Sequence, residues 1–217
     1  MTALGRPVKR KGFSWFIENV LPKLEGNFVL LIIGPFDKTR SWKDRLFSCI
    51  PGIIRTKLEL LPEYPSDENM VRRLLLEKRS DDKAIHLGTL SYKDLRQVLS
   101  VTDAFLIPNI SVKGDMEGFG LVCLEGSLCG AWVFASQVDG LTDAVHANKN
   151  GTLIPAKNTS EWVSALNRVI NEPTHFHHLQ NAAKYNTKDN FGWKKMVDSY
   201  LKIFGERMQE TIKTSQF

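Results

Sequence analysis

The segment Phe28-Val29-Leu30-Leu31-Ile32-Ile33-Gly34-Pro35 is an unbroken apolar run that stops at a glycine-proline pair. A short run of this kind is typical of a strand that is buried on both faces of a parallel sheet. Shorter runs of the same kind follow at residues 84–87, 104–107 and 132–135. The repeated pattern predicts a parallel sheet whose two faces are both covered.

Helical patterns separate these runs. Residues 13–24 carry an apolar stripe at spacings of three and four, which Pro22 is expected to end or kink. Ser91 with Asp94 forms a capping box ahead of another helix. Further helices are predicted at about 66–78 and 119–128, and from residue 159 onward, with a last helix at 190–217. The alternation of strand and helix predicts an α/β fold, a doubly wound parallel sheet with helices on both faces.

The length of 217 residues suits a single domain over 1–217. Residues 37–80, which several prolines interrupt, are interpreted as an elaborated connection between a strand and a helix. The first strand is reduced to residues 2–4. Two explanations stay open for so short a strand: the chain is cut from a longer protein, or the sheet borrows its edge from a partner.

Composition excludes several classes of protein. The 29 basic and 24 acidic residues give a net charge of +5, and the basic residues are scattered without a repeated basic-aromatic pattern, so a nucleic-acid partner is not expected. The longest apolar run, residues 28–33, is far shorter than the roughly 20 residues of a membrane helix. A local anion site remains compatible with this charge.

The three cysteines, Cys49, Cys123 and Cys129, have no paired metal spacing. They are interpreted as free thiols in a reducing, cytoplasmic compartment. The pI of about 9.1 fits either a peripheral position at the inner face of a membrane or simple solubility.

Histidines do not indicate a metal site. His175, His177 and His178 lie in a polar helical stretch without a neighbouring cysteine or carboxylate, which favours a solvated face. His86 lies inside a short apolar strand and is interpreted as a core residue or as a wall of a ligand site. The absence of an Asp-x-Asp pair in a phosphate-binding context predicts that no metal ion is required.

The most informative segment, residues 115–125, leaves one predicted strand and opens a helix. Gly118 and Gly120 allow backbone amides to approach a ligand, and a helix N-terminus attracts anions. Glu117 and Glu125 flank these glycines, so one ligand could reach both carboxylates only if it were long and rich in hydroxyl groups. The alternative is a plain turn followed by a solvated helix glutamate.

A second candidate segment lies near the N-terminus. Arg6 and Lys11 stand five residues apart around a turn that ends in Gly12, just before a helix. A guanidinium and an ammonium that converge on one point suit a diphosphate. The neighbouring Lys9 and Arg10 keep open the alternative of an exposed basic loop.

These segments together resemble the C-terminal half of the GT-B retaining glycosyltransferases, a family that includes glycogen synthases, sucrose synthases and mannosyltransferases. The sequence departs from the family pattern at Glu125-Gly126, where Glu-Ala is usual, and at Pro108-Asn109, where Pro-Ser is usual. The resemblance covers nearly the whole chain and rests on Gly5-Arg6-x4-Lys11-Gly12, Gly34, Leu87-Gly88, Glu117-Gly118-Phe119-Gly120-x4-Glu125, Cys129-Gly130 and Phe191-Gly192-Trp193.

The resemblance implies a Rossmann-like domain that binds a nucleoside-diphosphate sugar, linked to UDP, GDP or ADP. It implies that Arg6 and Lys11 stabilise the leaving diphosphate, that Glu117 holds the donor sugar, and that Glu125 holds the ribose. The implied catalytic residues are Arg6, Lys11 and Glu117, and the implied donor-binding residues are Gly34, Gly118, Phe119, Gly120, Leu121 and Glu125. No cofactor is implied beyond the donor itself.

The resemblance also implies that the chain is one half of a GT-B architecture, without the N-terminal acceptor domain. The expected reaction is retaining transfer of a hexosyl group to a hydroxyl of a carbohydrate or lipid-linked acceptor. The isolated chain is then expected to be inactive without its N-terminal domain. Two alternatives stay open, half of a nucleotide-sugar epimerase and a stand-alone nucleotide or sugar-binding module.

Overall fold

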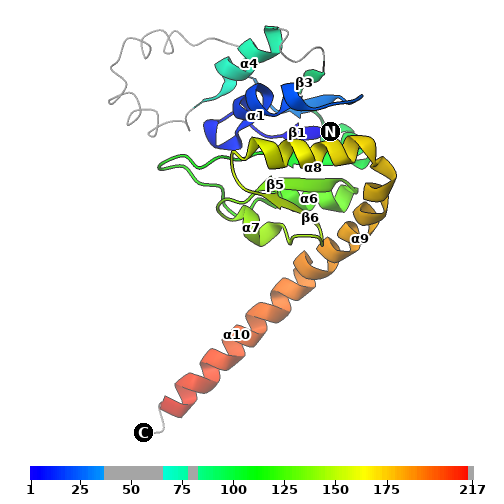
Figure 1. Cartoon of the computed structure of the whole chain (residues 1–217). Helices are drawn as coiled ribbons and strands as arrows, with labels where there is room; N and C mark the ends of the chain where they lie inside the picture. Colours follow the sequence, from blue (N-terminus) through cyan, green and yellow to red (C-terminus); the bar gives the residue numbers. More distant parts are fainter. Residues whose placement is uncertain (37–65, 78–82, 215–217) are drawn as a thin grey trace, which may run out of the picture.

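The computed structural model describes residues 1–36, 66–77 and 83–214. Within them, six strands form one parallel sheet in the order β3-β2-β1-β4-β5-β6 (Figure 1). The strands are β1 Thr2–Leu4, β2 Leu30–Ile33, β3 Ala84–Gly88, β4 Ala104–Ile107, β5 Trp132–Ser136 and β6 Gly151–Ile154. This order is that of a doubly wound Rossmann-like sheet. The fold class expected from the sequence is confirmed.

The short strand β1 lies inside the sheet. Thr2 is in register with Leu31 of β2 on one side and with Phe105 of β4 on the other. The alternative that the sheet borrows its edge from a partner at this strand is therefore wrong. Because β1 has a hydrogen-bonded neighbour on both sides, three residues are enough to join the two halves of the sheet.

Helices cover both faces of the sheet. They are α1 Phe13–Asn19, α4 Glu68–Leu76, α5 Tyr92–Ser100, α6 Leu121–Cys129, α7 Leu141–Ala144, α8 Thr159–Asn171, α9 Pro173–Phe191 and α10 Trp193–Thr214, with the short 3-10 turns η1 Lys9–Lys11 and η2 Leu21–Lys23. Pro22 lies in η2, after α1 has ended. Ser91 caps α5 by accepting a hydrogen bond from the Asp94 amide. Both local predictions are confirmed.

Two apolar cores form because successive strand residues point to opposite faces. On β4, Leu106 belongs to one core and Phe105 to the other. The first core includes Phe16 of α1, Val71 of α4 and Trp162 of α8, and the second includes Leu99 of α5, Cys123 of α6 and Leu141 of α7. Burial on both faces explains why β4 and β5 read as continuous apolar runs, whereas Ile85 and Leu87 of the edge strand β3 are exposed.

The C-terminal region is helical, as expected. α9 packs against α6, and α10 extends away from the rest of the domain (Figure 1). Several apolar side chains of α10 are exposed, including those of Trp193, Tyr200 and Phe204. In the described part of the chain, every helix is too short or too polar to cross a membrane.

Most of the predicted connection at 37–80 falls in residues 37–65 and 78–82, which lie outside the described residues together with Cys49. The helix predicted at about 66–78 is present as α4. Asp67, the residue just before α4, contacts α1. Its carboxylate accepts hydrogen bonds from the backbone amide and the hydroxyl of Ser14. Helix α4 therefore covers the same face of the sheet as α1.

Candidate functional site at the switch point of the sheet

The centre of the sheet is a topological switch point. The chain runs outward from β1 through β2 to β3 in one direction and from β4 through β5 to β6 in the other. Ligands of open α/β sheets bind in the crevice at the carboxyl ends of the strands on either side of such a point. The two candidate segments follow β1 and β4, so the structure places both at this crevice.

The segment after β1 turns sharply before α1. It passes through η1 and then Gly12, whose φ of 67° and ψ of 17° lie in the left-handed region. A Cβ atom on Gly12 would lie 2.0 Å from the carbonyl oxygen of Pro108, so the two loops touch here. The amide of Ile110 donates a hydrogen bond to the carbonyl of Arg10 at 2.8 Å. The β1 loop and the β4 loop are therefore joined through their backbones.

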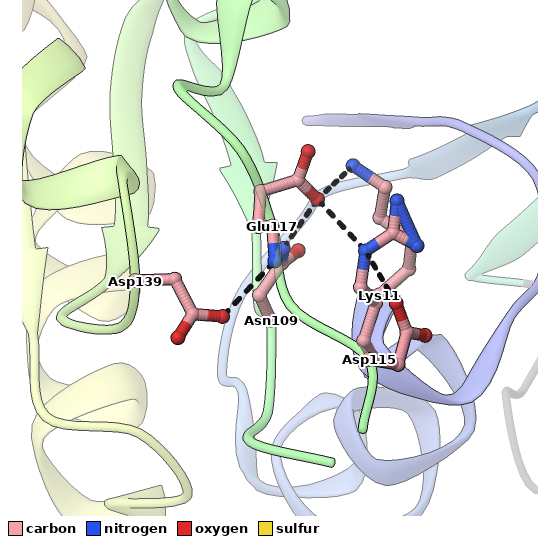
Figure 2. A network of polar contacts seen from close by, with 6 residues as sticks. Lys11, Asn109, Asp115, Glu117 and Asp139 are labelled. Carbon is pink, nitrogen blue, oxygen red and sulfur yellow. Dashed lines mark hydrogen bonds and ion pairs between the residues drawn. The ribbon is translucent and has the colours of Figure 1, made fainter. Parts of the chain in front are cut away.

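Lys11 and Glu117 form the central contact of the site. Lys11 Nζ donates a hydrogen bond to Glu117 Oε2 at 2.7 Å, and Asn109 Nδ2 donates to the same oxygen at 2.9 Å (Figure 2). Arg10 Nε lies 3.4 Å from this oxygen. Figure 2 shows no dashed line from the other carboxylate oxygen to the residues drawn. One oxygen of Glu117 therefore takes all three of these contacts.

The surroundings of Glu117 favour its ionised form. Burial by itself would raise the pKa of this carboxyl, but the hydrogen bond and charge of Lys11, with Asn109 and Arg10, outweigh burial and lower it. The Glu117 side chain is only 12% exposed. At neutral pH the site therefore holds a carboxylate that is fixed in position and ready to accept hydrogen bonds.

A buried carboxylate lies beneath this contact. The Asp115 side chain is fully buried, and its Oδ1 lies 3.5 Å from Arg10 Nε (Figure 2). The same guanidinium thus faces the carboxylates of Asp115 and Glu117. A buried charge is costly without a partner, so the ion pair between Arg10 and Asp115 holds the loop after β4 next to η1.

A further carboxylate reaches the backbone of this loop. The amide of Glu117 donates a hydrogen bond to Asp139 Oδ2 at 3.0 Å (Figure 2). Asp139 follows β5, the next strand along the sheet. Glu117 is therefore held through its side chain by the β1 segment and through its main chain by the β5 loop.

Helix α6 begins two residues later than the sequence pattern suggested. Gly120 caps it in the left-handed conformation, at φ 74° and ψ 48°. A right-handed helix cannot include a residue in this conformation, so the helix starts at Leu121 and Phe119 stays in the loop. The first amides of a helix lack partners within the helix, so the N-terminus of α6 presents N–H groups at the crevice edge of the sheet.

The other expected donor-site residues lie in the loops after the strands or on helix α6. Arg6 is exposed in the loop after β1, and Gly118 is exposed with open space where a side chain would be. Gly34 directly follows β2 and touches the backbone of Gly5, since a Cβ on Gly34 would lie 2.0 Å from the Gly5 carbonyl oxygen. Glu125 is exposed on α6, about 6 Å along the helix axis from Leu121. Of the expected pairs, the structure shows direct contact for Lys11 with Glu117.

His86 belongs to the edge of this crevice. Its Nε2 lies 2.9 Å from the carbonyl oxygen of Gly34, and its ring stacks on Phe36 with 3.5 Å between ring centroids. Among the described residues, no three His, Cys, Asp or Glu side chains gather in a way that could hold a metal ion. His175, His177 and His178 are exposed on α9.

Sequence reasoning missed four residues of the site. Arg10 was assigned to an alternative exposed loop, Asn109 was noted only as a departure, and Asp115 and Asp139 were given no role. Each of the four lies just beyond the carboxyl end of a strand that borders the crevice, or in the turn that follows it. The rule that ligands bind at the carboxyl ends of parallel strands could have identified Asp139 in particular.

The fold and the site together define a Rossmann-like α/β domain with cations, a helix N-terminus and a carboxylate at its switch point. Residues 1–189 match the family model described as Glycosyl transferases group 1. The chain belongs to the glycosyl transferases group 1 family. Its fold is that of the C-terminal half of a GT-B glycosyltransferase.

Known proteins with related sequences or folds include three informative examples. D-inositol 3-phosphate glycosyltransferase of Saccharomonospora viridis is 31% identical over 163 residues, which are 73% of this chain and 36% of that protein. The structure of HepE from Anabaena in complex with UDP and glucose has a TM-score of 0.68 at 16% identity, and the match covers 94% of this chain and 47% of HepE. The C-terminal domain of the group 1 glycosyltransferase LpcC of Francisella tularensis has a TM-score of 0.62 at 15% identity, and the match covers 88% of this chain and 85% of that domain.

The lengths of these matches agree with one another. The chain spans about a third of the curated relative and about half of the HepE chain, but most of the isolated C-terminal domain of LpcC.

Proposed function

We propose that the chain binds the nucleoside-diphosphate sugar donor of a glycosyltransferase that transfers a hexosyl group with retention of configuration. The observation that carries this proposal is the Lys11–Glu117 contact of 2.7 Å at the switch point of the sheet. In this proposal Lys11 is the cation for the diphosphate and Glu117 is the carboxylate for the sugar hydroxyls. The reported complexes of HepE with UDP and with UDP and glucose support this choice of ligand.

Arg6 and Lys11 serve the leaving group in this proposal. Breaking the bond between the sugar and the diphosphate increases the negative charge on the phosphate oxygens. Two cations and the N-terminus of α6 stabilise this charge more strongly in the transition state than in the bound donor. Lys11 exchanges part of its contact with Glu117 for the phosphate. These groups supply the positive charge without a metal ion.

Glu117 and Glu125 hold the two ends of the donor. The free oxygen of Glu117 accepts hydrogen bonds from sugar hydroxyls, and the exposed carboxylate of Glu125 accepts them from the ribose. The loop at Gly118 and Phe119 and the amides of Gly120 and Leu121 line the path between them. Gly34 lies at the end of β2, where it keeps the neighbouring backbone close to the base.

The acceptor belongs to a second domain in this proposal. Because the chain spans about a third of the curated relative, we infer that an N-terminal domain supplies the site for a carbohydrate or lipid-linked hydroxyl. The chain alone then binds donor without transferring the sugar. A cytoplasmic location, at a membrane surface or away from it, follows from the free thiols and the basic charge and belongs to the same proposal.

Calorimetric titration of the chain tests the donor site directly. UDP, GDP and ADP and their glucose, mannose and N-acetylglucosamine conjugates are each titrated into the wild-type chain. We expect selective binding of one base, with a further contribution from one sugar. Failure to bind any of the nine conjugates or their three nucleotides would overturn the proposed donor site.

The stereochemical part of the proposal needs the acceptor half. The chain joined to its N-terminal domain is incubated with the donor identified by titration, and the anomeric proton of the product is followed by NMR. We expect the anomeric configuration of the donor to be retained. An inverted product would contradict retention but leave the donor-binding role intact.

A further inference from the structure

We propose that Asp139 is a positioning residue for Glu117, which fixes the backbone of Glu117 so that its carboxylate meets the donor sugar. This inference rests on the proposed function and adds a specificity role for the loop between β5 and α7. It is carried by backbone geometry and by hydrogen bonds between two loops that are 22 residues apart in the sequence.

The backbone conformation of Asp139 is unusual. Its φ is 46°, in the left-handed region that side chains other than glycine seldom adopt. Aspartate and asparagine tolerate this region better than other residues, because their short polar side chains form local hydrogen bonds. Here the carboxylate reaches across to the amide of Glu117 at 3.0 Å. The strained conformation thus aims the side chain at the candidate site.

The two loops also meet through a second hydrogen bond and through close packing. The amide of Gly140 points to the carbonyl oxygen of Glu117 at 3.5 Å. A Cβ on Gly140 would lie 1.8 Å from the carbonyl oxygen of Gly118, so only glycine fits at this approach. Leu141 packs beneath Gly120, where a Cβ would lie 2.5 Å from its Cδ2. The β5–α7 loop is therefore a platform beneath the whole segment from Glu117 to Gly120.

This platform determines where the Glu117 carboxylate lies. Lys11 and Asn109 hold the Glu117 carboxylate through their side chains, which do not fix the main chain of Glu117. The bond from Asp139 instead fixes the main chain from which the side chain extends. Loss of the hydrogen bond to Asp139 leaves the cations for the diphosphate in place, but the Glu117 carboxylate that binds the sugar is no longer fixed. The expected defect is therefore specific to the sugar.

Three variants separate this role from a direct contact with the donor. Asp139→Asn keeps an oxygen that accepts the Glu117 amide and keeps the tolerance for a positive φ. Asp139→Ala removes the acceptor, and both variants are uncharged. Asp143→Ala is the matched control, since Asp143 is an exposed carboxylate on the neighbouring helix α7 and its loss changes the net charge by the same amount.

The first measurement is the ratio of the dissociation constants for the free nucleoside diphosphate and for its sugar conjugate. We expect Asp139→Ala to weaken binding of the conjugate about tenfold, which is the size of one lost hydrogen bond to a charged group, and to leave the free nucleotide within about twofold. Asp139→Asn and Asp143→Ala should keep the wild-type ratio. Equal loss for both ligands, or an Asn variant as poor as the Ala variant, overturns the inference.

The second measurement needs no ligand. The titration of the Glu117 carboxyl carbon is followed by NMR in the same variants. If Asp139 positions Glu117, Asp139→Ala moves the pKa of Glu117 back toward its ordinary value, because the carboxylate no longer stays beside Lys11, and Asp139→Asn does not. Identical titrations in the two variants refute the positioning role. If the wild-type chain binds no donor but the titrations differ, the proposed function fails while the positioning of Glu117 stands.

Discussion

Lys11 Nζ and Glu117 Oε2 are 2.7 Å apart, although the two residues lie 106 positions apart in the sequence. They meet because β1 and β4 are neighbours in the sheet and both segments leave the carboxyl ends of these strands. The order of strands, rather than the order of residues, assembles the site. This contact at the switch point is the basis of the predictions that follow.

Replacing Lys11 should weaken binding of the nucleotide. We expect Lys11→Ala to raise the dissociation constant for the nucleoside diphosphate about ten- to a hundredfold, because it removes a charged hydrogen-bond donor from the phosphate site. Lys9→Ala serves as the control, since Lys9 is an exposed lysine in the same short turn. Calorimetric titration of both variants measures the effect. An equal loss of nucleotide affinity in the two variants would contradict a specific role of Lys11 and would indicate a general effect of positive charge.

Replacing Glu125 should separate binding from stability. Because the Glu125 side chain is exposed on α6, we expect Glu125→Ala to weaken nucleotide binding but to leave the melting temperature within about 1–2 °C of the wild type. Calorimetry and thermal unfolding measure the two quantities. A variant with normal binding and a lower melting temperature would indicate a purely structural glutamate.

Removing the buried guanidinium should destabilise the fold. Arg10→Ala leaves Asp115 buried without its cation, which typically costs about 3–5 kcal/mol of unfolding free energy. The double variant Arg10→Ala, Asp115→Asn should recover part of this loss, because the uncompensated charge is gone. Urea unfolding of the two single variants and the double variant completes the cycle. A double variant whose loss equals the sum of the single losses would show that the two side chains do not interact.

The lowered pKa of Glu117 predicts how stability depends on pH. The pKa of Glu117 is lower in the folded state than in the unfolded state, so ionisation of this carboxyl stabilises the fold. This contribution to the free energy of unfolding is complete above the ordinary pKa of 4.5 and is lost as the pH falls through the lower folded pKa. Glu117→Gln lacks this contribution. We expect the difference in melting temperature between wild type and variant to be constant near neutral pH and to shrink below about pH 4.5. A difference that grows in acid would contradict the direction of the shift.

Cys123 should be chemically inert in the folded chain. Burial raises the pKa of its thiol to about 12, so almost no thiolate is present at pH 8. We expect iodoacetamide to spare Cys123 in the native chain and to modify it after unfolding in urea. Mass spectrometry of peptides locates the label. Rapid native labelling of Cys123 would show that α6 opens locally or that the thiol is more acidic.

Local features of the fold could be predicted from sequence because they depend on near neighbours. Residues 30–33 of the apolar run at 28–33 form β2, Ser91 caps α5, and the helix predicted after the glycines is present as α6. The start of α6 was placed two residues early, since the pattern of apolar residues does not show that Gly120 is in the left-handed conformation. The spacing of apolar residues and the capping of helices depend on short segments, so they can be predicted without knowledge of the tertiary structure.

The sequence by itself therefore determined the α/β class and the chemistry of the candidate site, with its basic residues after one strand and its carboxylates after another. Only the tertiary structure decided which of these groups meet. It placed the three residues of β1 inside the sheet, brought Lys11 to Glu117, and added Arg10, Asp115 and Asp139 to the site. The physical reason is that these contacts join loops from neighbouring parallel strands, and the order of the strands depends on how the whole chain buries both faces of its sheet.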